Sequence, residues 1–330
     1  MTANDEINTS NMPSEKLKKQ KRSYWDIWER FGIYIILIIF ALLLSLLSNR
    51  FFTIQNLSNI TRQVATLAII SSGLLTTVVT GRVDLSIGAF SGLTGALIAG
   101  WSIQFGALSA LLMGFGVALV WGFINGFLVT RGKSLDVIVT LSMMMIAQGL
   151  TLLYTNGRPI IGFPESINFL GNADVVGVPM LVLVAAIVML AIHIVLRYTT
   201  FGRELYAIGG NMEAARLSGI PANFRIITAY MISAVLSALA GLIMIGRVAS
   251  AQPTAGVGDE FTAVGAVLLG GASMSGGVGT IPGALAGVLI LGLISNGLNL
   301  LHVNPYFQYV VKGLIILFAI LMDQFGRKSD

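Results

Sequence analysis

The sequence predicts an all-α polytopic membrane protein. Hydrophobic residues make up 55% of the 330 residues, charged residues only 11%, and the mean hydropathy is +0.84. The apolar runs 32–47, 108–129 and 178–196 have, or approach, the roughly 20 residues that a helix needs to cross a bilayer. Because these runs are continuously apolar and do not alternate, they disfavour an outer-membrane β-barrel. The 38 glycines fit closely packed membrane helices.

About ten spans are expected along the chain, with boundaries good to several residues. The predicted ranges are 32–47, 64–80, 85–102, 107–130, 135–154, 178–196, 222–246, 261–273, 282–301 and 306–323. The eighth range contains Gly265, Gly270 and Gly271, so it forms either a span or a re-entrant segment.

The first thirty residues are polar, and no apolar core follows a short basic start, so a cleaved signal peptide is not expected. Tyr24, Trp25, Trp28 and Phe31 alternate with charged residues, a pattern typical of a short helix at the lipid headgroups. A partner-binding role for these aromatic residues is the alternative. The predicted organisation is a cytoplasmic tail with an interfacial helix at 1–31, a membrane-spanning domain at 32–323 that includes a cytoplasmic loop at 197–221, and a cytoplasmic tail at 324–330.

The distribution of Lys and Arg predicts the topology, because basic residues that flank spans are retained in the cytoplasm. With the N-terminus inside, the basic residues of 16–22, 82, 131–133, 197–216 and 327–328 are cytoplasmic. The opposite side then receives Arg50, Arg62, Arg158 and Arg247. We therefore expect both termini in the cytoplasm. The net charge of +5 is explained by topology and requires no nucleic-acid partner.

The two halves of the chain contain a similar motif. Residues 122–128 (GFINGFL) and 292–298 (GLISNGL) each occupy a comparable place in an apolar run. Transporters are often built from internal repeats, with the solute path where the repeats meet. The alternative is chance recurrence of Asn-Gly in a glycine-rich chain. On the repeat hypothesis, Asn125 and Asn296 lie near the path.

Asp84 lies in the short polar stretch 80–88 (TGRVDLSIG), between two predicted spans. A carboxylate at membrane depth costs about 2.5–3.5 kcal/mol on insertion scales, so it needs a partner or a polar interior. Arg82 is the nearest basic residue. Asp84 either caps the next helix in a broken-helix element near the path, or is a plain cap on a tight cytoplasmic turn. A role in proton coupling is a third interpretation.

Neither catalysis nor nucleotide binding is indicated. The chain has no cysteine, and its two histidines lie in or beside apolar runs. Segment 268–280 resembles a phosphate-binding loop but lacks the following lysine, so we expect close packing and a flexible joint there. The Gly-Lys-Ser at 132–134 lacks P-loop spacing, and no metal-ligand spacing occurs. Lys312 is interpreted as a side chain that extends towards one membrane interface.

The polar segment 197–221 interrupts the apolar runs. Asn211 can cap a helix of about two turns that ends at Gly219 and Pro221, with Glu213 in its first turn. Met212, Ala215 and Leu217 are available as apolar contacts. Such a short helix is marginal alone and suits docking onto a partner. A solvated loop is the alternative.

Residues 200–220 (TFGRELYAIGGNMEAARLSGI) resemble the cytoplasmic loop of simple-sugar ABC transporter permeases, the group for ribose, xylose, arabinose and galactose. Segments 81–88, 136–141 and 267–279 also resemble motifs of that family, and the likeness covers nearly everything after residue 50. Two positions depart from the family pattern. Arg82 replaces a frequent glycine and Leu135 a common proline, which leaves the geometry of both turns open.

The resemblance implies a non-enzymatic permease subunit in the cytoplasmic membrane, paired with a second copy or a paralogue. It implies as partners a cytoplasmic ATPase, which binds ATP and Mg²⁺, and an extracytoplasmic solute-binding protein; the chain itself binds no cofactor. The expected ATPase-coupling residues are Gly202, Asn211, Glu213, Ala214, Ala215, Arg216, Leu217, Ser218, Gly219 and Ile220. The expected translocation-path residues are Gly81, Asp84, Ser86, Asn125, Thr140 and Asn296.

Three other functions stay open at the level of sequence. A nucleoside or branched-chain amino acid ABC importer would have a closely related permease. An ion-coupled secondary transporter would need acidic residues within its spans, and Asp84 is the candidate. An intramembrane enzyme is disfavoured because no catalytic constellation is found.

Overall fold

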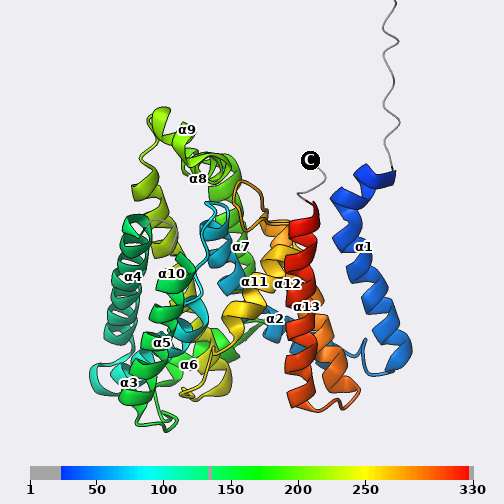
Figure 1. Cartoon of the computed structure of the whole chain (residues 1–330). Helices are drawn as coiled ribbons and strands as arrows, with labels where there is room; N and C mark the ends of the chain where they lie inside the picture. The colour runs from blue at the N-terminus through cyan, green and yellow to red at the C-terminus, as the bar shows by residue number, and fades with distance from the viewer. Residues whose placement is uncertain (1–23, 133–135, 327–330) are drawn as a thin grey trace, which may run out of the picture.

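The computed structural model describes residues 24–132 and 136–326, which are mostly helical (Figure 1). The helices are α1 Tyr24–Leu47, α2 Ile54–Val78, α3 Ile87–Phe105, α4 Ala107–Arg131, α5 Asp136–Thr155, α6 Glu165–Asn172, α7 Met180–Tyr198, α8 Thr200–Gly210, α9 Met212–Leu217, α10 Ala222–Val248, α11 Asp259–Leu269, α12 Ile281–Leu300 and α13 Pro305–Gly326. The strands are β1 Asp174–Val175 and β2 Val178–Pro179. The predictions for 1–23, 133–135 and 327–330 lie outside the described residues.

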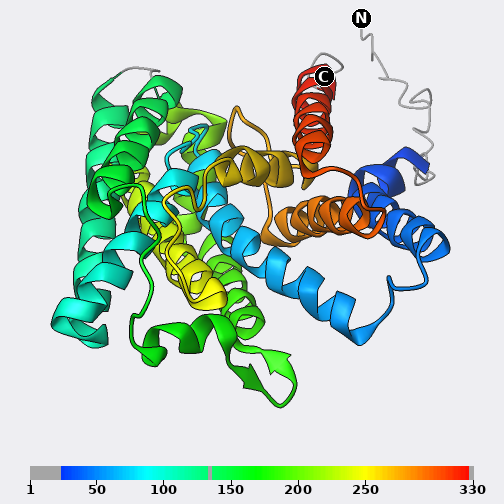
Figure 2. The same ribbon diagram turned by 90° about the horizontal axis from the view of Figure 1, so that it is seen from below.

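Helices α2 and α10 pack against each other at the centre of the molecule. Helix α10 also packs on α3, α4 and α6, whereas α2 packs on α7, α11 and α12. Helix α5 covers α3, and α13 covers α11. Figure 2 shows α1 at the edge of the molecule, where it packs against α12.

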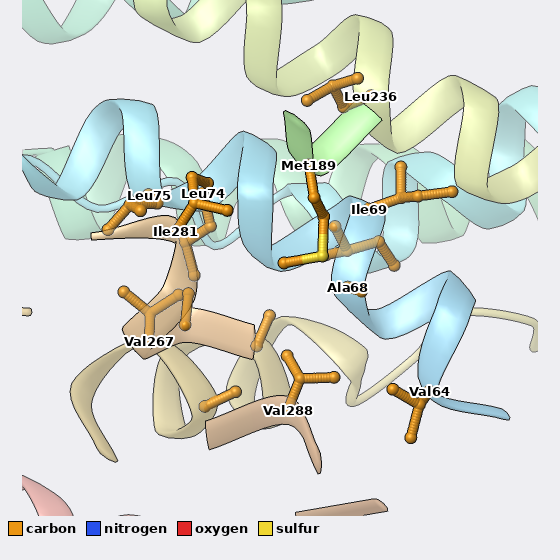
Figure 3. Close-up of a cluster of buried hydrophobic side chains, with 14 of the residues drawn as sticks. Val64, Ala68, Ile69, Leu74, Leu75, Met189, Leu236, Val267, Ile281 and Val288 are labelled. Atoms are coloured by element: carbon orange, nitrogen blue, oxygen red, sulfur yellow. The ribbon is translucent and has the colours of Figure 1, made fainter. Parts of the chain in front are cut away.

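The largest apolar cluster surrounds α2. Figure 3 shows Leu74 and Leu75 of α2 beside Ile281 of α12, with Val267 of α11 close by. Almost every α2 residue from Val64 to Val78 is buried. Because α2 is enclosed by other helices and does not face lipid, it can carry polar side chains. Its buried hydroxyl groups mostly donate to carbonyls of their own helix, as Ser72 does to Ala68 at 2.7 Å.

Five of the described helices, α4, α5, α7, α10 and α12, are long and apolar enough to cross a membrane. Each predicted span has a helix at the expected place in the chain. Helices α2 and α3 are long enough but less apolar than these five. They are rich in small and hydroxyl-bearing residues, which face other helices of the protein. Helix α2 also begins at Ile54, ten residues before the predicted boundary.

Helix α11 is the exception among the predicted spans. Its 11 residues extend about 16 Å at 1.5 Å per residue, roughly half of the hydrocarbon thickness. The chain turns after it at Gly270 and Gly271, where Gly271 has φ +81°. Segment 261–273 therefore does not cross as a regular helix, and its geometry fits the re-entrant alternative. The count of ten crossings stays a prediction.

The connection between α5 and α7 contains two elements that were not predicted. Helix α6 and the β1–β2 hairpin occupy the connection between α5 and α7, so the chain is mostly rather than entirely helical. The hairpin pairs Val175 with Val178 in antiparallel register. Its turn residues Val176 and Gly177 have φ +53° and +79°, as a two-residue turn with positive φ at both positions requires.

One end of the helix bundle carries α8 and α9 (upper end in Figure 1). Helix α1 begins and α13 ends at this same end. Helix α10 leaves α9 at this end and runs towards the opposite one. Residues 24–31 continue directly into the rest of α1, so one helix contains both the aromatic stretch and the first apolar run.

Candidate functional site

The polar segment 197–221 folds into two helices, of which only the second was predicted. Thr199 caps α8, because its hydroxyl accepts the Gly202 N–H at 3.2 Å. A Cβ on Gly202 would lie 2.2 Å from the Leu196 carbonyl oxygen. Gly202 is therefore buried in the tight corner between α7 and α8 and does not lie on a surface. The Thr-Thr pair and the apolar positions 201, 205 and 208 were the available signal for α8.

Helix α9 has the predicted cap. The Asn211 side-chain oxygen accepts the N–H of Ala214 at 2.9 Å, and the helix runs over Met212–Leu217. Gly219 follows with φ +83°, and Pro221 precedes α10 as its N-cap residue. The predicted start and end of this helix are confirmed.

The two faces of α9 differ. Ala215 is 4% exposed and packs with Ile226 and Tyr230 of α10, and Met212 is partly buried beside them. Our expectation that Ala215 is available to a partner is therefore wrong, because it attaches α9 to its own chain. Met212 keeps only part of its surface free for such a contact. Leu217 is 86% exposed. The other exposed side chains or backbone positions here are Asn211, Glu213, Ala214, Arg216, Ser218 and Gly219, whereas Ile220 is half-buried.

Helix α8 contacts the α2–α3 and α11–α12 connections at three glycines that we call the glycine junction. Gly209 comes from α8, Gly81 from the α2–α3 connection and Gly276 from the α11–α12 connection. A Cβ on Gly209 would lie 2.0 Å from the Val79 carbonyl oxygen, and one on Gly276 would lie 2.7 Å from the Gly209 Cα. Three backbones thus meet with no room for side chains. The close packing expected of segment 268–280 is confirmed at this point.

Hydrogen bonds and an ion pair reinforce the attachment of α8. The Tyr206 hydroxyl donates to the Gly279 carbonyl at 2.7 Å, next to the glycine junction. Glu204 of α8 forms an ion pair with Arg225 of α10. These contacts couple α8 to α10 and to the α11–α12 connection, so a movement of α8 would displace both.

Asp84 lies in the connection between α2 and α3 and is 1% exposed. Its carboxylate accepts the Ser86 N–H at 3.0 Å, the Ser86 hydroxyl at 2.7 Å and the Ser233 hydroxyl at 3.3 Å. The Ser86 hydroxyl in turn accepts from Asn125 at 2.8 Å. Burial raises the pKa of Asp84 to about 6, although the hydrogen bonds from Ser86 and Ser233 act to lower it.

The structure corrects two details of this polar cluster. Arg82 does not pair with Asp84 but lies 3.7 Å from Asp136 of α5. Asp84 does not accept the free N–H groups of the α3 helix. It accepts that of Ser86, which is the N-cap residue itself. The Ser86 N–H and the hydroxyl groups of Ser86 and Ser233 therefore compensate this carboxylate, and no cation among the described residues forms an ion pair with it.

The six predicted path residues do not form one site. Asp84, Ser86 and Asn125 belong to the polar cluster, and Thr140 adjoins it by donating to the Val83 carbonyl at 3.3 Å. Gly81 belongs to the glycine junction. Asn296 lies elsewhere and exchanges two hydrogen bonds with Asn56, at 2.7 and 3.1 Å. Their role in a path stays a prediction.

Asp84→Ala is expected to destabilise the purified chain by about 2–4 kcal/mol, because it leaves three buried donors without their acceptor. Asp84→Asn keeps one acceptor oxygen at the same size and serves as the matched control, with an expected loss of about 1 kcal/mol. Thermal unfolding in detergent measures both. Equal melting temperatures for the two variants would contradict the assigned role of this carboxylate.

A second polar site lies between α2 and α10–α13. It is a cavity of about 150 Å³ whose lining includes Arg247, Asp259 and Lys312. Lys312, which we interpreted as a side chain that extends towards one membrane interface, lines this cavity, and its place relative to the membrane stays a prediction. Asp259 is partly buried, and the neighbouring Glu260 is 1% exposed. The sequence analysis named Asp84 as the candidate interior carboxylate and missed both of these residues, since Asp259 and Glu260 begin the short helix α11 instead of interrupting an apolar run.

The bundle of long apolar helices is that of a multi-pass membrane protein. The family described as "Branched-chain amino acid transport system / permease component" matches residues 56–320, and the chain belongs to this family.

Curated relatives cover almost the whole chain. The ribose import permease protein RbsC of Bacillus subtilis (strain 168) is 41% identical over 318 residues, which are 95% of this chain and 99% of that protein. The ribose import permease protein RbsC of Escherichia coli (strain K12) is 43% identical over 92% of this chain and 96% of its own. The L-arabinose transport system permease protein AraH of Escherichia coli (strain K12) is 33% identical over 94% and 95%. No solved structure was found to match.

Proposed function

We propose that this chain is the membrane-spanning permease subunit of an ATP-driven importer of a simple sugar. The observation that carries the proposal is its likeness, at 41–43% identity and over more than nine-tenths of the chain, to ribose import permeases. A likeness to an L-arabinose permease over a similar length supports a monosaccharide substrate more broadly.

The ATPase partner docks at the α8–α9 end of the bundle, which is the cytoplasmic end. Arg197, Arg203 and Arg216 lie in this region, in agreement with the retention of basic residues in the cytoplasm. The exposed Leu217 and the charges beside it supply the docking surface. ATP and Mg²⁺ bind to that partner. An extracytoplasmic binding protein delivers the sugar at the opposite end.

The subunit works as a dimer and contains two related halves. Two matching sets of packing partners support the repeat: α3 packs on α4, α5 and α10, and α11 packs on α12, α13 and α2. The motifs at 122–128 and 292–298 lie on α4 and α12, which are corresponding helices in this scheme. ATP-driven closure of the partner would rock one half against the other.

A branched-chain amino acid is the second candidate substrate, because the matching family carries that description. The two candidates are separated by uptake into proteoliposomes that contain the permease, its ATPase and its binding protein. We expect ATP-dependent uptake of an aldose such as D-ribose or L-arabinose, and none of L-leucine. Uptake of L-leucine alone would replace the proposed substrate class, and uptake that does not require ATP would refute the importer mechanism.

A further inference from the structure

The cavity between α2 and α10–α13 has the properties of a ligand-binding site. Its volume of about 150 Å³ far exceeds the roughly 10–15 Å³ that one water molecule needs. Besides its three charged residues, its polar lining consists of the amide of Gln63 and the hydroxyl groups of Thr66, Thr262 and Ser295. The apolar part of the wall comes from α2, α10 and α12.

Thr66 supplies the first specific observation. Its side chain is 5% exposed, and its hydroxyl has no hydrogen-bond partner among the described residues. A buried hydroxyl without a hydrogen-bond partner costs free energy. Most buried hydroxyl groups in membrane helices therefore donate to a backbone carbonyl of their own helix. Thr151 of α5 illustrates that usual arrangement, because it is also buried, at 1% exposed, and donates to the Ala147 carbonyl at 2.8 Å. Thr66 therefore has a hydrogen-bonding capacity that a ligand in the cavity can use.

The charged residues supply the second observation. Arg247, Lys312 and Asp259 form no ion pair in the part of the chain that the structure describes, although all three line one cavity. Arg247 donates to the Arg62 carbonyl at 3.3 Å and keeps further N–H groups. The site thus offers charged donors and a charged acceptor at the same time.

This combination of groups selects among ligand classes. A simple anion would meet Asp259, and a simple cation would meet Arg247 and Lys312. A neutral molecule with several hydroxyl groups satisfies both, because each hydroxyl donates one hydrogen bond and accepts others. The amide and hydroxyl groups of Gln63 and Ser295 add further partners of the same kind.

The position of the cavity also suits a transport site. Asp259 and Thr262 belong to the first turns of α11, the helix that extends only about half of the membrane thickness. Transporters commonly bind their solutes beside such interrupted helices, near the middle of the membrane. Arg247 is the penultimate residue of α10, at its end away from α9. The cavity therefore lies on the side of the bundle from which a binding protein would release the solute.

We propose that this cavity binds the transported solute inside the permease, and that the solute is a neutral polyhydroxylated molecule of monosaccharide size. The inference rests on the proposed importer function and adds to it the site and the residues that contact the solute. Thr66, Arg247, Asp259 and Ser295 are the expected contacts.

The first test uses the matched threonines. Thr66→Val removes the unpartnered hydroxyl, and Thr151→Val removes the hydroxyl of another buried threonine, outside the cavity. In proteoliposomes with the ATPase and the binding protein, we expect Thr66→Val to lower sugar uptake per ATP hydrolysed at least fivefold without lowering the melting temperature. Thr151→Val should keep wild-type coupling. Equal uptake per ATP in the two variants would overturn the proposal.

The second test detects occupancy directly and uses the absence of cysteine from the chain. Thr66→Cys and the control Thr151→Cys are exposed to a small hydrophilic thiol reagent in the assembled importer, with D-ribose, D-xylose, L-arabinose, D-galactose or L-leucine added at saturating concentration. We expect at least one of the four sugars to slow modification of Cys at position 66 severalfold, and L-leucine to have no effect. The control position should not respond to any of them.

The results of the thiol-modification experiment separate the proposed site from the proposed importer function. Failure of the reagent to modify position 66 in any state of the ATP cycle, or protection by L-leucine alone, would overturn the inference. Sugar uptake by the unmodified importer without protection at position 66 would overturn the site and leave the importer function standing. An importer that takes up none of the sugars would refute the proposed function itself, and the inference with it.

Discussion

Leu217→Asp is expected to abolish ATP-dependent uptake while the permease still inserts and assembles with correct mobility in gel filtration. Leu217 projects from α9 with 86% of its side chain exposed, next to the charged residues Glu213 and Arg216. A large apolar side chain so placed is a good anchor for a groove on the ATPase. Loss of such an anchor typically costs about 2 kcal/mol or more, which is about 30-fold in affinity.

The measurement compares binding of the ATPase to detergent-solubilised permease variants, together with uptake in proteoliposomes. Leu217→Met is the matched control, because it keeps an apolar side chain of similar volume and should retain near wild-type binding. Ala215→Asp would not test docking, because Ala215 is buried against α10 and its replacement should disturb the fold of the permease itself. Normal ATPase binding by Leu217→Asp would show that α9 is not the docking surface.

Much of the architecture could be predicted because a bilayer limits the choices for an apolar chain. Long apolar runs had to become helices, and caps such as Asn211 act locally, so both could be predicted from the sequence. The same reasoning left two alternatives open at 261–273, a span or a re-entrant segment. The apolar residues of this segment are buried by neighbouring helices rather than by lipid, and hydropathy does not distinguish the two environments.

The interior sites depend on contacts between segments far apart in the chain, which no local pattern encodes. Asp84 had Arg82 as its neighbour in sequence, yet its donors include Ser233, 149 residues away. Lys312, Asp259 and Arg247 come from three helices, and each has a plausible local explanation on its own. Helix α8 was missed because its apolar positions 201, 205 and 208 follow the spacing of a surface helix and do not form the continuous apolar run of a membrane span.

Gly209→Ala is expected to reduce uptake at least tenfold, although it adds a single methyl group. That methyl would lie 2.0 Å from the Val79 carbonyl oxygen and 2.4 Å from the Gly277 nitrogen. Both neighbours are backbone atoms, and they are hydrogen-bonded to each other: the Gly277 N–H donates to the Val79 carbonyl at 2.9 Å. A side-chain rotation therefore cannot relieve the clash. Either α8 moves away from the glycine junction or this hydrogen bond breaks.

Gly210→Ala is the control, because a Cβ there meets no atom within 4 Å and the residue does not have positive φ. The two variants change neighbouring residues by the same methyl group, so a general effect on α8 helicity would appear in both. If the glycine junction transmits movement of α8 to the α11–α12 connection, Gly209→Ala should retain ATPase binding through α9 while uptake per ATP falls. Loss of uptake in both variants, or in neither, would mean that the close backbone contact at Gly209 is not what joins the ATPase to the transport helices.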